Sequence, residues 1–112
     1  MRVHTYESSS GRDLIMEYIN SLSKPEIVDG LSVLQSMENG RMDELNIMPW
    51  VGKVWEVYFY NHNRIFYITV DGNNIYLLHA CRKQKNKTEK TDKNIVINRA
   101  KELGSLLNKK FI

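Results

Sequence analysis

The chain has 112 residues, enough for one domain with a modest hydrophobic core, and we expect residues 1–112 to form a single domain. No segment approaches the roughly 20 apolar residues that span a bilayer, and the opening MRVHTYESSSGRD lacks the apolar core of a signal peptide. The single cysteine, Cys81, excludes an internal disulfide and indicates a reducing compartment, so we expect a cytoplasmic protein.

The net charge of +3 hides a strong asymmetry between the two halves of the chain. Residues 1–60 carry 5 basic and 9 acidic side chains, whereas residues 61–112 carry 11 basic and 4 acidic ones. A basic half in a compact domain favours a polyanionic partner such as nucleic acid. A solvated, lysine-rich surface is the alternative explanation.

The first 40 residues predict a short strand followed by a helical hairpin. The opening VHTYE alternates weakly, as a short strand does, and apolar residues then recur with helical spacing over about 12–22. Ser23 and Glu26 have the spacing of a capping box at the start of a second helix, and Gly40 predicts where that helix ends. Two helices joined so closely form a hairpin over residues 12–39.

The hydrophobic period changes to two at about residue 53. Residues 41–52, which contain Pro49 and Gly52, predict a loop. Three alternating apolar runs follow, separated by the turn signals NHN and DGNN, and a last helix follows them to about residue 108, with Thr91 or Asp92 as its N-cap. The order β-α-α-β-β-β-α predicts an α+β domain with a small antiparallel sheet, whose meander has strands at 53–60, 64–70 and 75–82.

A basic tract follows the last predicted strand. Only Glu89 and Asp92 oppose its six basic side chains. In an antiparallel pair the start of one strand lies near the end of its partner, so we expect Arg64 to lie close to the beginning of the tract. This convergence predicts a phosphate site, formed with basic residues from the set Arg82, Lys83, Lys85, Lys87, Lys90 and Lys93.

Three tyrosines lie on the same predicted sheet as this basic tract. Tyr58, Tyr60 and Tyr67 can stack on nucleic-acid bases. Cross-strand packing is the alternative interpretation for Tyr58 and Tyr60, because aromatic side chains commonly pack in this way between neighbouring strands.

Other patterns of catalytic residues are lacking in the sequence. His4, His62 and His79 have no ligand-like spacing, so we expect three unrelated histidines and neither a metal nor a cofactor. The sequence shows no residues that could form a nucleophilic triad with Cys81, and it contains no glycine-rich phosphate loop.

Five short segments form an ordered series along the chain: WEVY at residues 55–58, RIFY at 64–67, IYLLH at 75–79, RKQKNKT at 82–88 and RAKE at 99–102. In order and spacing they resemble the WELR, YRVLY, IVLLHGF, KKTQKTP and R-x-K-E motifs of the RelE/ParE superfamily of bacterial toxins, specifically its phage-derived HigB-like branch. The upstream segment GRDLIMEYINSLSKPE is similar to the first-helix region of that family, so the resemblance covers nearly the whole chain.

The resemblance implies a RelE-like fold and the toxin of a type II toxin-antitoxin system. Such a toxin is a metal-independent, ribosome-dependent mRNA endoribonuclease that inhibits translation. Its partners are the ribosome, mRNA and a HigA-like helix-turn-helix antitoxin from a neighbouring gene. In the reaction a ribose 2′-hydroxyl attacks the adjacent phosphate, which requires a base, positive charge on the phosphorane and an acid for the leaving oxygen.

The resemblance and the basic tract together suggest which residues form the site. We expect His79 to act as the acid or base, although a hydrogen-bonded histidine at a strand end is an equally good interpretation. The candidate catalytic residues are Arg64, His79, Arg82 and Lys83. The candidate RNA- or ribosome-binding residues are Tyr58, Lys85, Lys87, Lys90, Lys93 and Arg99.

The chain departs from the family's pattern at two positions near this site. Tyr58 stands where WELR has its arginine, and Glu89 stands where KKTQKTP has its proline. Two other functions therefore stay open. One is a non-catalytic, ParE-like gyrase inhibitor, against which the dense lysine tract argues, and the other is a decayed toxin that retains only antitoxin binding.

Overall fold

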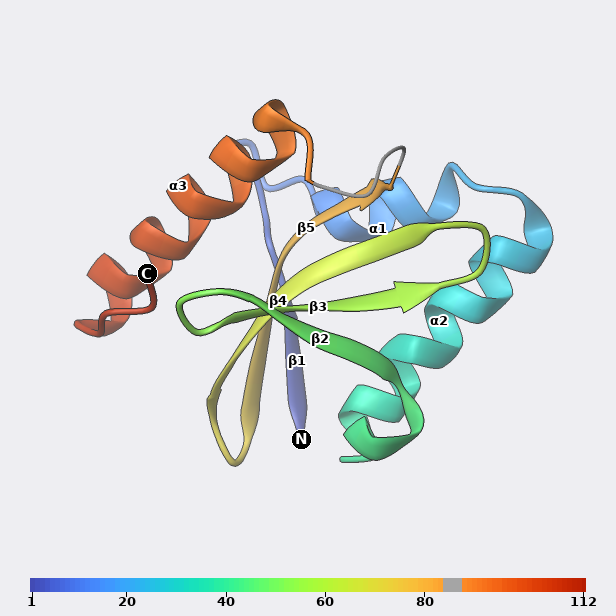
Figure 1. Ribbon diagram of the computed structural model, residues 1–112, viewed down its shortest axis with the longest axis horizontal. Coiled ribbons are helices and arrows are strands. Elements are labelled where there is room, and N and C mark those ends of the chain that lie inside the picture. The colour runs from blue at the N-terminus through green and yellow to red at the C-terminus, as the bar shows by residue number, and fades with distance from the viewer. Residues whose placement is uncertain (84–87) are drawn as a thin grey trace.

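The computed structural model describes residues 1–83 and 88–112 and confirms the α+β class (Figure 1). Within these ranges no helix is long and apolar enough to cross a membrane. The elements run in the order β1 (Arg2–Thr5), α1 (Leu14–Asn20), α2 (Lys24–Glu38), the 3-10 helix η1 (Met42–Glu44), β2 (Asn46–Val51), β3 (Val54–Phe59), β4 (Asn63–Asp71), β5 (Asn74–Arg82) and α3 (Lys90–Leu107).

The strands form one five-stranded sheet in the order β1-β5-β4-β3-β2. The predicted meander is confirmed, because β3, β4 and β5 pair antiparallel in sequence. The expectation of a purely antiparallel sheet is wrong, since β1 pairs parallel with β5. Parallel strands need a long connection, and the chain from α1 to β4 provides it.

The sheet also contains a strand that the sequence did not predict. β2 lies within residues 41–52, which were expected to form a loop, and it pairs antiparallel with β3. Its Pro49 cannot donate a backbone hydrogen bond and therefore reads as a loop residue, but β2 is an edge strand, where proline is tolerated. Gly52, with φ +56°, turns the chain from β2 into β3.

The predicted helical hairpin is confirmed and covers one face of the sheet. The Asp13 carboxylate accepts a hydrogen bond from the Met16 backbone N–H at the start of α1, and Gly40, with φ +71°, follows the end of α2. The predicted capping box does not form, because the Ser23 hydroxyl donates to the Glu26 carboxylate at 2.7 Å. The core beneath the hairpin consists of Ile15, Ile19, Val33, Met37, Val57, Phe59, Ile65, Tyr67, Ile75, Leu77 and Ala80.

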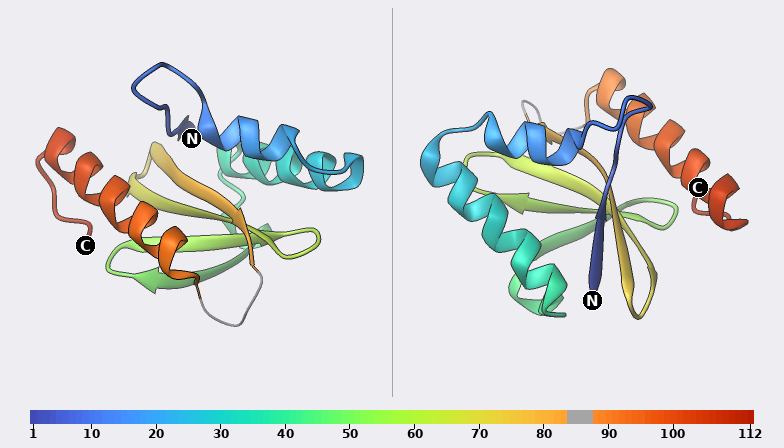
Figure 2. Two further views of the ribbon diagram at one scale, coloured as in Figure 1. Left: turned by 90° about the horizontal axis from the view of Figure 1, so that it is seen from above. Right: turned by 180° about the vertical axis from the view of Figure 1, so that it is seen from behind.

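Helix α3 packs against the opposite face of the sheet (Figure 2). It begins at Lys90 with Glu89 as its N-cap residue, so the prediction of Thr91 or Asp92 as the cap is wrong. The Asp92 side chain instead contacts a residue of β5. The second core, between α3 and the sheet, consists of Val54, Phe66, Ile68, Leu78, Cys81, Val96, Ala100, Leu103 and Phe111.

Candidate functional site

The backbone of Arg64 lies beside the end of β5, as predicted. Arg64 pairs with Cys81 in the β4–β5 ladder, and the neighbouring pair is Asn63 with Arg82. The Lys83 backbone N–H donates to the His62 carbonyl at 2.7 Å, which extends the pairing just beyond the strand.

The side chains, however, separate onto two faces of the sheet. Successive residues of a strand point to opposite faces, so Arg82 points away from the face that Cys81 shares with its cross-strand partner Arg64. The guanidinium of Arg82 lies on the hairpin side, where it contacts Glu26 of α2 at 2.8 Å. The expectation that Arg64, Arg82 and Lys83 surround one phosphate is therefore wrong for Arg82.

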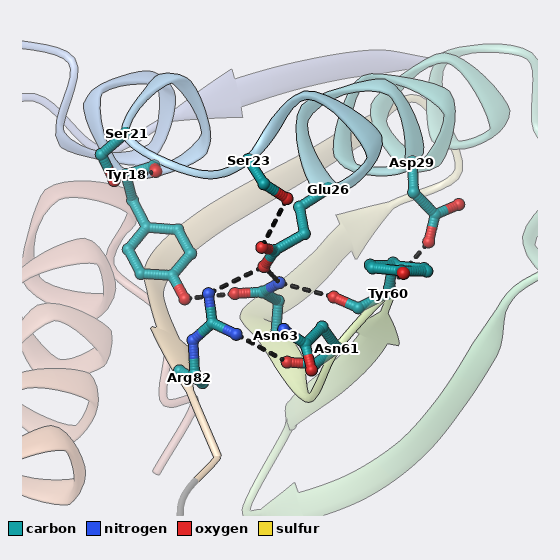
Figure 3. Close-up of polar contacts among 9 residues, drawn as sticks. All are labelled: Tyr18, Ser21, Ser23, Glu26, Asp29, Tyr60, Asn61, Asn63 and Arg82. Carbon is teal, nitrogen blue, oxygen red and sulfur yellow. Dashed lines mark hydrogen bonds and ion pairs between the residues drawn. The ribbon is translucent and has the colours of Figure 1, made fainter.

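Arg82 instead belongs to a network on the hairpin side of the sheet (Figure 3). The buried Glu26 carboxylate accepts hydrogen bonds from Asn63 at 2.6 Å, from Ser23 at 2.7 Å and from Arg82 at 2.8 Å. These hydrogen bonds, chiefly the one from Asn63, lower the pKa of Glu26 to about 2. We call this the hairpin-face network and define it as Tyr18, Ser23, Glu26, Asn63 and Arg82, with Tyr18 donating to the Asn63 side chain.

On the opposite face, polar side chains gather between the sheet and the start of α3. Lys83 lies over the ring of Tyr58, the Tyr58 hydroxyl donates to Glu56, and Glu56 forms an ion pair with Arg64. Arg64 in turn lies beside the Cys81 thiol. We call this the α3-face cluster and define it as Glu56, Tyr58, Arg64, His79, Cys81, Lys83 and Asp92.

Arg64 is the most deeply buried charge of this cluster. Its side chain is 3% exposed, and its Nη1 donates to Glu56 Oε2 at 3.0 Å. The guanidinium also lies over the ring of Phe66, 5.0 Å from the centroid. Among the described residues, the buried Arg64 Nε has no hydrogen-bond partner. Arg64 thus supports the cluster from beneath rather than facing solvent.

The predicted aromatic residues lie at three different depths. Tyr58 is half-buried at the rim, with its ring 5.2 Å from the Lys83 ammonium, and burial raises the pKa of its hydroxyl to about 12. Tyr60 is exposed, and its backbone N–H donates to Asp29 (Figure 3). Tyr67 is buried in the hairpin-side core, so the expectation that it stacks on a base is wrong.

A β-bulge turns His79 towards α3. Phe66 pairs with His79 and Tyr67 with Leu77, so Leu78 is an extra residue in β5. Leu77 lies in the core beneath the hairpin, and strict alternation would place His79 on that same face. The extra residue shifts the alternation, and His79 meets α3 instead. The Leu78 carbonyl accepts a hydrogen bond from Arg99 of α3 at 2.8 Å.

The imidazole of His79 is held by a carboxylate. Its Nε2 lies 2.8 Å from Asp92 Oδ1, and the ring stacks beside Phe66 with centroids 6.3 Å apart. Burial lowers the pKa of His79, although the Asp92 carboxylate opposes this effect. The imidazole is therefore neutral at physiological pH, which leaves it able to accept a proton.

Cys81 lies beside this pair, on the same face of β5. Burial raises the pKa of its thiol to about 11, so it is a protonated thiol rather than a nucleophile. The potential ligand atoms of His79, Cys81 and Asp92 all lie within 4.8 Å of one another. The spacing of the histidines along the chain gave no sign of this grouping around His79.

The remaining predicted RNA-binding residues differ in their surroundings. Lys90 and Lys93 are exposed at the start of α3, whereas Lys85 and Lys87 lie outside the described residues. Arg99 is partly buried, where its guanidinium lies 4.1 Å from the Tyr6 ring centroid and donates to the Leu78 carbonyl. Burial lowers the pKa of Arg99. Arg99 thus anchors α3 to the sheet and lies apart from the exposed lysines.

Sequence reasoning missed three members of the α3-face cluster. Glu56 and Tyr58 are two residues apart in β3, so the alternation of the strand places them on one face. The sequence thus contained a signal that Glu56 belongs to the site. Cys81 was regarded as an isolated cysteine, although it lies two residues from His79 on one strand. Asp92 carried no signal, because its contact with His79 depends on the path between β5 and α3.

A comparison with family models identifies the family of the chain. The family model described as phage-derived protein Gp49-like (DUF891) matches residues 17–101, about three quarters of the chain. The match runs from α1 into the second half of α3 and includes every member of the α3-face cluster. No curated protein matches the chain significantly.

Proposed function

The chain belongs to the phage-derived Gp49-like family, a RelE/toxin-like family, and on that premise we propose that it is the toxin of a type II toxin-antitoxin system. Its activity in this proposal is ribosome-dependent cleavage of mRNA, which inhibits translation in the cytoplasm. The phosphodiester bond breaks when the neighbouring ribose 2′-hydroxyl attacks the phosphate, so the enzyme needs no metal for this step.

The α3-face cluster is the observation that supports this proposal. It gathers an aromatic ring, a lysine ammonium and a carboxylate-bound imidazole at the end of β5, where the basic tract begins. Cleavage by a 2′-hydroxyl requires a base and positive charge, and unstacked RNA bases bind to aromatic rings. The proposed site thus supplies the base and the positive charge from one face, and the leaving 5′-oxygen takes its proton from water.

Each role follows from the position of the side chain. His79 is the general base for the 2′-hydroxyl, and Asp92 is a positioning residue that holds the imidazole. Lys83 lies at the rim and stabilises the charge of the phosphorane, while Tyr58 provides a surface for a base. Arg64 acts from beneath, since its ion pair with Glu56 fixes the group to which Tyr58 donates.

The exposed lysines provide affinity rather than chemistry in this proposal. Lys90 and Lys93 lie on the first turn of α3, close in sequence to Lys83, and phosphate contacts of this kind need charge but little geometry. Lys85 and Lys87 carry the same expectation from sequence. The proposed protein partner is a helix-turn-helix antitoxin of the HigA type, encoded by a neighbouring gene.

One observation favours a second candidate function. Glu56 neutralises Arg64 in a buried ion pair, and no second arginine stands at position 58. A cluster with less free positive charge suits a decayed toxin that retains antitoxin binding but not cleavage. The lysine tract argues against a ParE-like gyrase inhibitor.

Induced expression in cells separates these three functions. With the nuclease, growth stops, protein synthesis falls and mRNA is cleaved within coding regions, and co-expression of the adjacent gene restores growth. Intact mRNA together with gyrase inhibition would favour the ParE-like alternative. Normal growth, with a stable complex between the two gene products, would favour the decayed toxin.

A further inference from the structure

Three donor atoms converge where β5 meets the start of α3. His79 and Cys81 lie two residues apart on one face of β5, and Asp92 faces them from the first turn of α3. The His79 Nε2–Asp92 Oδ1 distance is 2.8 Å, and all three donor atoms lie within 4.8 Å. A tetrahedral zinc ion separates its ligand atoms by roughly 3–4 Å, so small side-chain adjustments suffice to accommodate one.

We propose that His79, Cys81 and Asp92 form a binding site for a borderline-soft divalent cation, with Zn²⁺ as the best-fitting ion. Imidazole, thiolate and carboxylate are the three ligand types that zinc uses in proteins. Three protein ligands leave a fourth position for water. The site goes beyond the proposed nuclease but shares His79 and Asp92 with it, so a bound ion would occupy the imidazole that the nuclease uses as its base.

The charges of the site balance when the ion is bound. The Cys81 thiol releases its proton to solvent, and the ion replaces the His79–Asp92 hydrogen bond with one bond to each side chain. Thiolate and carboxylate together neutralise a divalent ion, with neutral imidazole as the third ligand. Two arginines lie nearby, but Arg64 is paired with Glu56, and Glu102 offsets the charge of Arg99.

The ligands are well supported and reachable from solvent. His79 and Cys81 lie on a strand within the sheet, and the bulge at Leu78 determines the face to which both point. Rigid elements hold metal ligands more accurately than loops do. The His79 and Asp92 side chains are 14% and 22% exposed, so an ion has access from that side.

Two measurements on the purified full-length chain test the site. Titration calorimetry with Zn²⁺ should show one ion per chain. Binding of Co²⁺ to the wild-type protein should give a sulfur-to-metal charge-transfer absorption, which reports directly on Cys81, the single cysteine of the chain. The cobalt spectrum is measured on the wild-type protein, so it does not depend on whether any variant folds.

Matched variants complete the test. Cys81→Ser and Asp92→Asn should each weaken Zn²⁺ binding by roughly 10–100-fold or more. Mutating a residue that only supports a metal ligand already costs that much, and these two residues are ligands themselves. His62→Asn is the control, because it removes an exposed imidazole at a position with φ +66°, which asparagine tolerates, and it should bind as the wild type does. A wild-type protein without the charge-transfer band, or a His62→Asn variant that binds as weakly as Cys81→Ser, would overturn the proposal.

Discussion

Glu26 shows how one residue determines what its neighbours are free to do. Its buried carboxylate is the common acceptor of the hairpin-face network and holds the Arg82 guanidinium at 2.8 Å. A buried carboxylate that loses its partners is costly, so Arg82 stabilises the fold where it lies. The arginine that begins the basic tract therefore connects β5 to α2 instead of facing the α3-face cluster.

The first prediction concerns the stability of the protein in acid. Glu26 has a pKa of about 2 in the folded protein, against about 4.3 in an unfolded chain. A depressed pKa stabilises the fold above the unfolded value, and this stabilisation is lost as the pH falls from about 4.3 towards 2. The wild type should therefore be more stable than Glu26→Gln at pH 7, and the difference should shrink at pH 3.

Urea denaturation at both pH values checks this prediction. Glu44→Gln, at an exposed position, is the control and should unfold much as the wild type does at pH 7. If Glu26→Gln lost as much stability between pH 7 and pH 3 as the wild type does, the hairpin-face network would not be the source of the acid sensitivity.

The site residues show what the sequence can and cannot predict. The turn signals placed Arg64 beside the end of β5, and the ladder confirms that pairing. Arg82 ends β5 and Lys83 continues its pairing for one residue, so alternation alone separates their side chains, and the prediction that grouped them is wrong for Arg82. The contact between Asp92 and His79 was beyond sequence reasoning, because it depends on where α3 docks.

At the scale of elements, the bulge in β5 connects the fold to the proposed chemistry. Leu78 is the extra residue, and its carbonyl accepts a hydrogen bond from Arg99. No local sequence signal announces such a bulge, since IYLLHAC reads as an ordinary strand. Strand β2 escaped prediction for a related reason, because Pro49 and Gly52 signal a loop unless the strand is known to lie at an edge.

The second prediction tests the link between Arg99 and His79. Arg99→Met should destabilise the fold by about 1.5–3 kcal/mol, the usual contribution of a hydrogen bond to a charged group. It should also shift the ring NMR signals of His79, because the bulge that places His79 loosens. Urea denaturation and NMR measure the two effects. A loss of stability with unchanged His79 signals would show that Arg99 holds α3 without positioning His79.

The third prediction concerns the turn between β2 and β3. A β-carbon at Gly52 would overlap the carbonyl oxygen of Phe111, to which the Lys53 backbone N–H donates at 2.8 Å. Gly40 also has a positive φ but has open space around it. Gly40→Ala should therefore cost about 1–2 kcal/mol from backbone strain alone.

Gly52→Ala should cost a further 1–3 kcal/mol, roughly the range for overpacking, because the C-terminal segment must move away from the turn. Thermal or urea unfolding of both variants gives the comparison. Equal losses for the two substitutions would mean that the C-terminal segment does not pack against this turn.

At the scale of the whole molecule, the two faces of the sheet have different characters. The hairpin side consists of a core and the hairpin-face network, whose polar members bond to one another. The α3 side combines a second core with the α3-face cluster and the exposed Lys90 and Lys93. In our proposal, these lysines of the basic second half of the chain serve the α3 face, which is the functional side of the protein.

The fourth prediction follows from this placement of charge. Lys90→Ala combined with Lys93→Ala should weaken binding to ribosomes and reduce the slope of log affinity against log salt by about 1–2. Lys101→Ala removes an exposed lysine farther along α3 and serves as the control. Ribosome pelleting at several salt concentrations measures both effects. An unchanged slope in the double variant would remove these lysines from the proposed interface.

The central claim is that the α3 face carries the chemistry. The most direct test is the rate at which the wild type and three variants cleave mRNA on purified ribosomes. Each variant is first shown to fold and to bind ribosomes. Our proposal predicts that His79→Asn and Lys83→Ala each slow cleavage by about 100-fold or more, as loss of an acid–base or charge-stabilising group does. It predicts that Arg82→Lys, which keeps a cation beside Glu26, cleaves at nearly the wild-type rate. Wild-type cleavage by His79→Asn and Lys83→Ala, with loss of cleavage in Arg82→Lys, would contradict the claim.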